Sequence, residues 1–245
     1  MELFKLKLNH FLIIVTVIIS AIFIYSFSSH VNDNFVSYQV NLKKQDLKLY
    51  WKDDKGQPLR SLHNLKSWLE TKNKTLVFAM NAGMYKVDNS PLGLFIENRK
   101  TISAVNNRTA AGNFYWKPNG ILFIDTANHA SICKTEKFTN NGKIKYATQS
   151  GPMLVFDGKI HPDFKKGSTN LNIRNGVGLL PDNELIFAMS KKEISLYDFA
   201  QYFLELGCKN ALSFDGFVCR TYLPEKNWIQ TDGDFGVIVG VTTSR

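Results

Sequence analysis

The feature that most constrains the fold of this chain is an alternation of short apolar runs with turn-forming residues, which begins near residue 36. Runs of about four to eight apolar, β-branched and aromatic residues, bounded by Gly, Pro, Asn and Asp, are typical of β-strands. The alternation reaches the C-terminus without an internal repeat or a linker. It predicts a strand-rich domain, with strands over residues 36–42, 47–51, 75–80, 93–96, 120–125, 153–156, 177–180, 185–189, 211–214 and 235–241.

Two segments carry apolar residues at helical spacing instead, residues 61–70 and 195–206. The second is the stronger helix prediction, because Ser195 and Asp198 form a variant of the capping box at its start. Gly207 follows this segment and is suited to a left-handed helix cap. We therefore expect two helices between the strands.

Two turn signals predict hairpins, Asp157-Gly158 and the Pro-Asp-Asn-Glu stretch of residues 181–184. With the strands and helices above, they give the expected fold class. This is α+β: a single strand-rich domain over residues 31–245, with a few helices packed on a mixed sheet.

The first 30 residues predict a signal peptide or signal anchor. Residues 11–25 are free of charge, Gly and Pro, Lys5 and Lys7 precede them, and a polar stretch follows. A buried core helix is the alternative, but a surface helix would show one apolar stripe, and this run is apolar on all faces. We expect an exported protein, periplasmic or at the cell surface. The segment is either cleaved or, over residues 11–27, anchored in the inner membrane.

The charge and the cysteines exclude some classes of function. The formal net charge is +9, but the basic residues occur mostly singly and form no block with interleaved aromatics, so we expect no nucleic-acid partner.

Of the three cysteines, Cys133, Cys208 and Cys219, the last two are the pair most suited to a disulfide in an oxidising compartment. Three reduced, buried thiols are the alternative. No cysteine spacing resembles a zinc site.

Candidate site residues stand where expected strands end in glycines and polar side chains. Taken singly, each such motif has a structural explanation, since Gly, Asn and Asp serve in turns. Taken together, strand tips of this kind converge on one edge of a sheet and build a site. The candidates are Asn81, Gly83, Asn119, Ser150, Gly151, Arg174, Asp215 and Gly216.

The order of these motifs resembles the phosphodiester glycosidase family, to which the enzyme that uncovers mannose 6-phosphate on lysosomal hydrolases belongs. The resemblance runs from about residue 78 to the C-terminus, through N-A-G-M-Y, K-P-N-G, Q-S-G-P-M-L, R-N-G-V-G and F-D-G. The family's Asp-Gly-Gly stretch followed by Ser reads Asp215-Gly216-Phe217-Val218-Cys219 here, and its Asn-Gly-Gly-Phe reads Asn81-Ala82-Gly83-Met84. These departures indicate a bacterial subfamily.

The resemblance implies hydrolysis of a sugar-1-phosphate diester at the bond between the anomeric carbon and oxygen. Ordinary glycosidases need a carboxylic acid to protonate a poor leaving group. A phosphate leaves more readily, so Arg174 is the candidate phosphate clamp. Asp215 is the candidate carboxylate, as a general base or as a stabiliser of the positive charge on the sugar. The structural alternatives are a surface ion pair for Arg174 and a turn cap for Asp215.

The remaining candidates, Asn81, Gly83, Asn119, Ser150, Gly151 and Gly216, would bind sugar hydroxyls or phosphate oxygens. Asp88, Glu97 and Asp125 are alternative acids. The five histidines form no evident triad, and we assign neither a metal nor a cofactor. The competing hypothesis is a non-catalytic carbohydrate-binding or envelope-assembly protein on the same scaffold. A protein-interaction domain is a weaker third.

Overall fold

The computed structural model describes residues 34–215 and 217–244. The expected N-terminal segment, residues 1–30, therefore lies outside the described residues. Contacts divide the chain into two units, Met1–Asp33 and Asn34–Arg245, and the second is described here by itself. Across residues 34–215 and 217–244, no helix is both long enough and apolar enough to cross a membrane.

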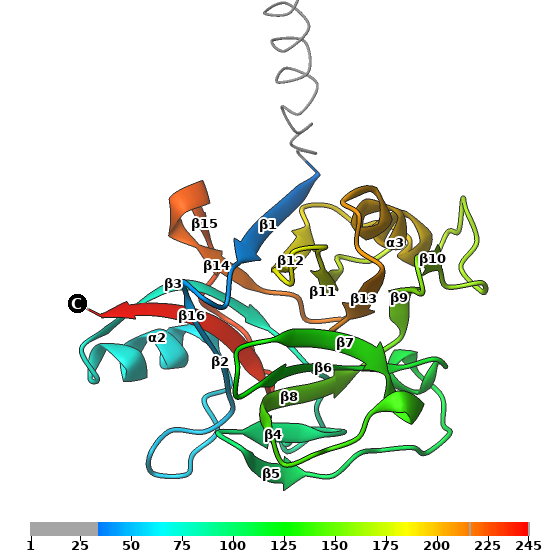
Figure 1. Cartoon of the computed structure of the whole chain (residues 1–245). Helices are drawn as coiled ribbons and strands as arrows, with labels where there is room; N and C mark the ends of the chain where they lie inside the picture. Colours follow the sequence, from blue (N-terminus) through cyan, green and yellow to red (C-terminus); the bar gives the residue numbers. More distant parts are fainter. Residues whose placement is uncertain (1–33, 216, 245) are drawn as a thin grey trace, which may run out of the picture. The chain divides into compact units, whose positions relative to one another are not determined.

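Three antiparallel sheets make up the domain (Figure 1). The first has the order β1-β12-β11-β13-β9-β10, the second β15-β14-β3-β16-β2, and the third β5-β4-β8-β6-β7. Every recorded strand pair is antiparallel, and several neighbours in a sheet are far apart in sequence. The strands are β1 (Phe35–Val40), β2 (Asp46–Tyr50), β3 (Lys74–Asn81), β4 (Phe95–Glu97), β5 (Lys100–Ser103), β6 (Gly120–Asp125), β7 (Ala130–Lys134), β8 (Ile144–Ser150), β9 (Met153–Phe156), β10 (Lys159–Ile160), β11 (Asn175–Leu179), β12 (Leu185–Ser190), β13 (Asn210–Ser213), β14 (Thr221–Leu223), β15 (Trp228–Ile229) and β16 (Ile238–Ser244).

The expected α+β class is therefore wrong. Within the described residues there are two α-helices, α2 (Leu62–Glu70) and α3 (Leu196–Glu205), with three short 3₁₀ turns, η1 (Asn113–Tyr115), η2 (Thr135–Lys137) and η3 (Pro224–Lys226). The sheets are antiparallel rather than mixed. The physical reason is that apolar periodicity marks a strand but carries no information on its direction. A parallel pair needs a long crossover connection, and most connections here are short.

The two hairpin predictions are confirmed. Asp157 and Gly158 join β9 to β10 with φ of 53° and 74°, the positive values that a two-residue turn of this type requires. Between β11 and β12, Asn183 adopts a φ of 61°, and the Leu180 N–H donates to the Glu184 carbonyl at 2.9 Å. Both turns lie where Gly or Asn tolerates the left-handed region.

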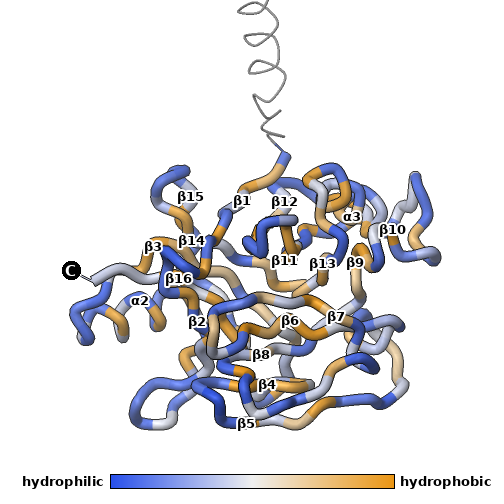
Figure 2. The backbone as a smooth tube through the Cα atoms, in the orientation of Figure 1, coloured by the Kyte–Doolittle hydropathy of each residue, from blue (hydrophilic) through white to orange (hydrophobic). Residues whose placement is uncertain are grey.

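The main core is enclosed by the three sheets and draws apolar residues from all of them, such as Phe78, Leu122, Phe187 and Val239. Figure 2 shows hydrophobic segments concentrated along the central strands and hydrophilic ones in the loops. A second cluster lies between α3 and the first sheet, where Phe199 and Phe203 are fully buried. Helix α2 packs instead against β3. Two faces of the sheets are thus covered by helices, and the strand ends are left to loops.

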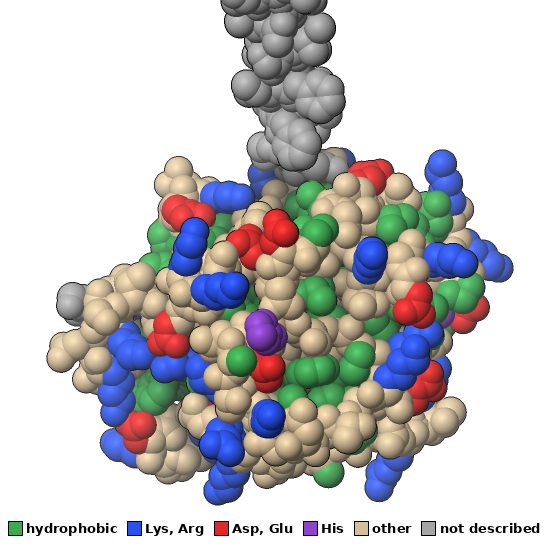
Figure 3. All heavy atoms as spheres, in the orientation of Figure 1, with side chains coloured by type: hydrophobic (Ala, Val, Ile, Leu, Met, Phe, Trp, Pro, Cys, Tyr) green, Lys and Arg blue, Asp and Glu red, His purple; other side chains and the backbone are tan. Residues whose placement is uncertain are grey.

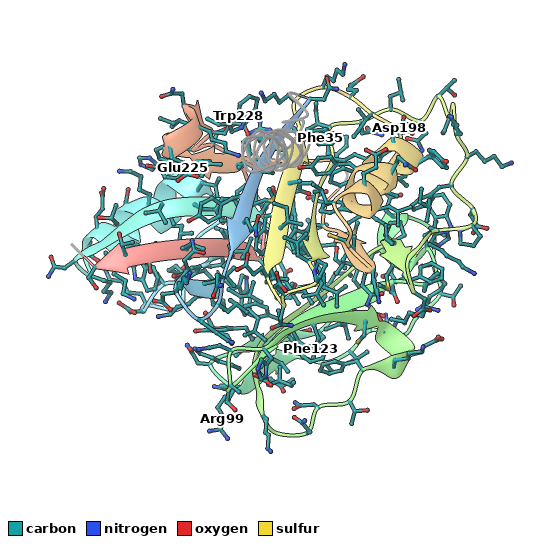
Figure 4. The ribbon with its side chains drawn as sticks, turned by 45° about the horizontal axis from the view of Figure 1, so that its top comes forward. Phe35, Arg99, Phe123, Asp198, Glu225 and Trp228 are labelled. Atoms are coloured by element: carbon teal, nitrogen blue, oxygen red, sulfur yellow. The ribbon has the colours of Figure 1, made fainter. Side chains whose placement is uncertain are left out.

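Phe35, at the start of β1, belongs to the cluster under α3. Its ring stacks on Tyr202 with the centroids 3.9 Å apart and lies 6.1 Å from Phe199. Figure 4 shows Phe35 and Asp198 on this part of the domain, and Phe123 and Arg99 on the third sheet. Helix α3 therefore helps to fix the first strand of the domain.

The cap predicted at Ser195 forms, and a second serine, Ser61, caps α2. Ser195 Oγ accepts a hydrogen bond from the Asp198 N–H at 3.1 Å and donates to Asp198 Oδ2 at 2.7 Å. Ser195 is fully buried, whereas Ser61, which caps α2 by accepting from the Asn64 N–H at 3.1 Å, is half-buried. Gly207, with φ of 84°, follows α3 in the left-handed region.

We expect Ser195→Ala to lower the free energy of unfolding by about 2 kcal/mol, the upper end of the range for cap removal, and Ser61→Ala by about 1 kcal/mol. The difference arises because Ser195 is buried and its loss also removes a partner of Asp198. Urea unfolding of the two variants measures both values. An equal loss in the two variants, or a greater loss for Ser61→Ala, would contradict this ranking.

Candidate functional site

Asn175, the first residue of β11, joins three segments that are distant in sequence. Its Nδ2 donates to both the main-chain O and the Oδ1 of Asn81 at 2.9 Å, and its Oδ1 accepts from the Asp215 N–H at 3.0 Å. Asn81 in turn donates to the Val218 carbonyl at 2.6 Å and accepts from the Arg220 N–H at 2.9 Å. All three side chains are buried, so the ends of β3, β11 and β13 are fixed to one another.

The third sheet reaches the same place through the end of β8. Ser150 is completely buried, and its Oγ donates to the Phe214 carbonyl, next to Asp215, at 2.7 Å. Gly83 follows β3 and lies against the same strand: a Cβ at this position would be 2.1 Å from Thr148 Oγ1. Gly83 is therefore needed for close packing between β8 and the segment that carries Asn81.

Asp215 is largely buried, with 8% of its surface exposed. Its Oδ1 accepts from the Phe217 N–H at 2.9 Å, as a turn cap would, and Gly216 between them lies outside the described residues. The negative charge of Asp215 also acts beyond its own turn. Burial, with the charge of Asp215 as the second cause, raises the pKa of Tyr85 to about 12. Asp215 thus caps its own turn, and its negative charge also acts on the loop that carries Tyr85.

Arg174 is buried, with 1% of its surface exposed, so a surface ion pair is excluded as its role. Its Nε donates to the Ile194 carbonyl at 2.9 Å and its Nη2 to the Asn170 carbonyl at 3.0 Å. Within residues 34–215 and 217–244, no carboxylate forms an ion pair with it. Burial lowers the pKa of this guanidinium, because desolvation disfavours the charged form.

The side chain of Arg174 lines a cavity of about 120 Å³, named here the Arg174 cavity. Lys165, Trp116 and Tyr197 are among its other walls, and Asp163, also in the wall, accepts from Trp116 Nε1 at 3.1 Å. Two cationic groups and two amphipathic rings therefore surround one small space. Such a combination can bind an anion and stack on a sugar ring.

Cys219 lies between Arg174 and Asp215. Its thiol is within hydrogen-bonding distance of the Ile173 carbonyl, at 3.3 Å, and of the Asp215 carbonyl, at 3.2 Å. The main chains that carry the two candidate catalytic residues thus meet around one sulfur atom. Burial, reinforced by the charge of Asp215, raises the pKa of the Cys219 thiol well above its usual range. The thiol is therefore protonated near neutral pH and is not a thiolate nucleophile.

The suggested disulfide between Cys208 and Cys219 is absent, and all three cysteines are free thiols. Cys208 is buried against Gly178 and α3, in a different cluster from Cys219. The two residues are close in sequence, but β13 and the turn at Asp215 separate them. The alternative of three reduced thiols fits the structure.

We expect a thiol reagent to find at most one reactive cysteine, Cys133, in the native protein and three after unfolding without reductant. Cys208 and Cys219 are buried, and Cys133 is half-buried. Burial raises the pKa of all three thiols, so that the reaction at Cys133 is also slow. Titration with Ellman's reagent at pH 8, with and without guanidinium chloride, gives the two counts. Fewer than three thiols in the unfolded protein would show a disulfide.

The predicted site residues Asn119 and Gly151 pack on each other. A Cβ on Gly151 would lie 2.7 Å from the Asn119 Cβ, and Asn119 Nδ2 donates to the Phe114 carbonyl at 2.9 Å. Asn119 lines a second cavity, of about 550 Å³, which does not include Arg174. Since Ser150 and Gly151 are consecutive, this second cluster continues directly from the end of β8.

The alternative acids have other surroundings. Asp88 and Asp125 accept hydrogen bonds from main-chain N–H groups of their own turns, at 2.8 to 3.0 Å. Glu97 lies at the end of β4, and burial raises its pKa. Within residues 34–215 and 217–244, no three His, Cys, Asp or Glu side chains gather where they could hold a metal ion.

Comparison with known proteins identifies the family of this chain. A model of the phosphodiester glycosidase family matches residues 74–236, which include every candidate site residue. The chain belongs to this family. A protein of Escherichia coli K12, the uncharacterised YigE, is 32% identical over 188 residues, which are 76% of this chain and 73% of that protein.

Solved structures share the fold at low identity. The zebrafish N-acetylglucosamine-1-phosphodiester α-N-acetylglucosaminidase catalytic domain, auto-inhibited by its pro-peptide, matches with a TM-score of 0.53 and 14% identity over 85% of this chain and 88% of that one. A hypothetical Synechocystis protein has a TM-score of 0.51 and 13% identity, covering 85% and 59%. A candidate exported protein of Burkholderia pseudomallei K96243 has a TM-score of 0.58 and 9% identity, covering 84% and 73%.

We assigned no site role to Asn175, Cys219 or Tyr85 from the sequence. Asn175 stands in the quoted R-N-G-V-G motif, but its neighbour Arg174 has the more evident chemistry. The signal available was an Asn at the start of an otherwise apolar strand, where a buried amide must find partners. The partners themselves, 94 and 40 residues away, cannot be read from that signal.

We expect Asn175→Ala to lower the free energy of unfolding by about 2–4 kcal/mol, because it leaves the buried Asp215 N–H and the Asn81 carbonyl without this partner. Asn172→Ala is the matched control. Its amide binds the exposed Asn170 side chain, and its loss should cost about 1 kcal/mol or less. Chemical unfolding measures both, and equal losses in the two variants would refute the role of Asn175.

Proposed function

We propose that this protein is a hydrolase that cleaves the glycosidic bond of a sugar-1-phosphate diester in an extracytoplasmic glycan or envelope polymer. The observation that carries the proposal is the buried cation of Arg174, which has no carboxylate partner in the described part of the chain and borders a cavity. A buried charge is costly unless an opposite charge compensates it. A bound phosphate would supply that charge.

The size and lining of the Arg174 cavity suit a phosphate. At about 10–15 Å³ for each water-sized group, its 120 Å³ has room for a phosphate and part of an attached sugar. Arg174 Nε and Nη2 are held by carbonyl oxygens, which fixes the orientation of the guanidinium plane. Lys165 adds a second cation to the wall, and Trp116 a ring on which a sugar can stack.

In the proposed reaction, water attacks the anomeric carbon while the bond from that carbon to the phosphate oxygen breaks. Asp215 accepts the proton that the water loses, or stabilises the positive charge that develops on the sugar ring. The electron pair of the broken bond leaves with the phosphomonoester. Arg174 and Lys165 stabilise the negative charge of that leaving group, so the reaction needs no strong acid to protonate it.

The proposed location rests on separate observations. The uncharged run of residues 11–25 predicts export, and one protein of the same fold is described as a candidate exported protein. Phosphodiester-linked glycans lie mainly outside the cytoplasm, so an exported domain would meet its substrate there. An anchor over residues 11–27 would keep it beside membrane-associated polymer.

A single incubation distinguishes the proposed reaction from its alternatives. The full chain is mixed with methyl N-acetylglucosamine-1-phosphate diester in ¹⁸O-labelled water. We expect free sugar carrying ¹⁸O at the anomeric carbon and unlabelled methyl phosphate. Label in the phosphate would indicate cleavage at phosphorus and would refute the glycosidase mechanism. Saturable binding without release would support the carbohydrate-binding alternative.

A further inference from the structure

A second cavity, of about 550 Å³, is lined by side chains that the proposed reaction does not use. It lies between residues 117–119, the end of β7, η2 and the end of β9, and is named here the Lys117 cavity. Its walls include two lysines, two buried polar side chains and one aromatic ring: Lys117, Lys134, Asn119, Thr135 and Phe156. It is larger than the Arg174 cavity and could hold more than one sugar unit.

The buried polar groups of the Lys117 cavity are fixed in place. Asn119 is 1% exposed and Thr135 5% exposed. Asn119 Oδ1 accepts from Lys117 Nζ at 3.3 Å, and Thr135 Oγ1 accepts from Gln149 Nε2 at 3.3 Å. The Thr135 hydroxyl can therefore donate its own proton to a ligand. A wall of this kind offers hydrogen-bond donors to an oxygen-rich ligand.

The two lysines supply positive charge at the rim. Lys134 is half-buried and lies with its Nζ 4.3 Å from the centroid of the Phe156 ring and 3.4 Å from Asp157 Oδ2. Lys117 is exposed, and Glu136 is the one acidic side chain in the wall. Elsewhere, Figure 3 shows Lys and Arg scattered over the visible face among Asp and Glu. A pair of lysines that shares a cavity with buried donors is suited to an anionic group.

The two cavities lie on opposite sides of one short segment. Trp116 lines the Arg174 cavity, whereas Lys117 and Pro118 line the Lys117 cavity. Residues 116–118, which separate the two cavities, are held in place by His161. His161 Nε2 donates to the Lys117 carbonyl at 2.9 Å. The buried His161 ring stacks on Phe164, with centroids 4.6 Å apart. Trp116 and Phe156 also meet the His161 ring edge to face.

From this arrangement we infer that the Lys117 cavity binds a second anionic unit of the same polymer whose phosphodiester occupies the Arg174 cavity. The inference rests on the proposed function. It narrows the substrate class to a glycan with repeating phosphate groups, in place of a single sugar diester. Two cationic cavities held at a fixed separation favour a ligand with repeating negative charges. Once one charge is bound in the first cavity, the next charge of the same ligand binds in the second cavity at a high effective concentration.

The test compares a short and a long substrate. The double variant Lys117→Gln/Lys134→Gln is assayed on methyl N-acetylglucosamine-1-phosphate diester and on an oligomer of N-acetylglucosamine-1-phosphate repeats. We expect KM for the oligomer to rise about tenfold or more, with kcat and the KM for the short diester unchanged. Lys55→Gln/Lys100→Gln is the matched control. It removes the same charge from exposed positions that line neither cavity, and should leave all values unchanged.

Failure of the inference and failure of the proposed function give different results. An unchanged KM for the oligomer, or an equal rise for both substrates, would overturn the inference and leave the hydrolase intact. If the wild-type chain hydrolyses neither substrate, the proposed function fails. The inference is then tested by calorimetry, which measures how tightly the wild-type chain and the variants bind the oligomer. Binding weakened about tenfold only in Lys117→Gln/Lys134→Gln would sustain it. Equal binding by all variants, or no binding, would overturn it.

Discussion

Replacing Asp215 by Asn should lower kcat for a sugar-1-phosphate diester by about 10²–10⁴-fold, the range that a positioned general base contributes. The variant keeps the turn, because an amide oxygen can still accept from the Phe217 N–H, and the bond from residue 215 to Asn175 uses the main chain. KM should change little, since Asp215 acts on the anomeric carbon and not on the phosphate. Steady-state assays of released sugar give both constants.

The matched control is Asp182→Asn, which makes the same change in the exposed turn between β11 and β12 and should be fully active. Urea unfolding of both variants separates loss of chemistry from loss of fold. Added formate should restore part of the activity of Asp215→Ala, because a small carboxylate can replace the missing one. Wild-type kcat in Asp215→Asn would exclude Asp215 from the reaction.

The local elements of this fold could be predicted from the sequence, but not how they combine. Ten strands and both helices follow from apolar periodicity and caps, which depend on neighbouring residues. Strand β8 is one of the strands that were missed, because its sequence IKYATQS is mostly polar toward its end. Thr148, Gln149 and Ser150 are nonetheless buried, since distant groups satisfy them: Gln149, for example, binds the main chain at Leu94 and Asn106. The direction of each strand could not be predicted either, because apolar periodicity carries no information on it.

The candidate site shows the same division. The glycines and polar residues at strand ends were visible as motifs, and hydrogen bonds join the segments of Asn81, Ser150 and Asp215. Arg174 lines a cavity whose walls include none of these three residues. What holds them is Asn175 and Cys219, whose partners are brought near only by the sheet order. The sequence likewise could not show that Asn119 lines a different cavity from Arg174, because that depends on where residues 161–174 fold back.

Arg174→Met should lower kcat/KM for the phosphodiester by about 10²–10³-fold or more, which is the usual cost of losing one donor to a developing negative charge. The loss should be much smaller for a 4-nitrophenyl glycoside of the same sugar, because its leaving group carries no phosphate for the guanidinium to bind. Arg174→Lys should lie between, since a lysine keeps the charge but not the planar fork. Steady-state kinetics on the two substrates measures this contrast.

The stability of Arg174→Met separates a functional cation from a structural one. A buried charge without an opposite charge is itself costly, and an apolar side chain of similar length removes that cost. The carbonyl of Ile194 keeps a partner in the variant, because it also accepts from the Asn172 N–H at 3.2 Å. We therefore expect the free energy of unfolding to change by about 1 kcal/mol or less. A loss of several kcal/mol, with equal activity loss on both substrates, would make Arg174 a structural residue and would remove the phosphate clamp from the mechanism.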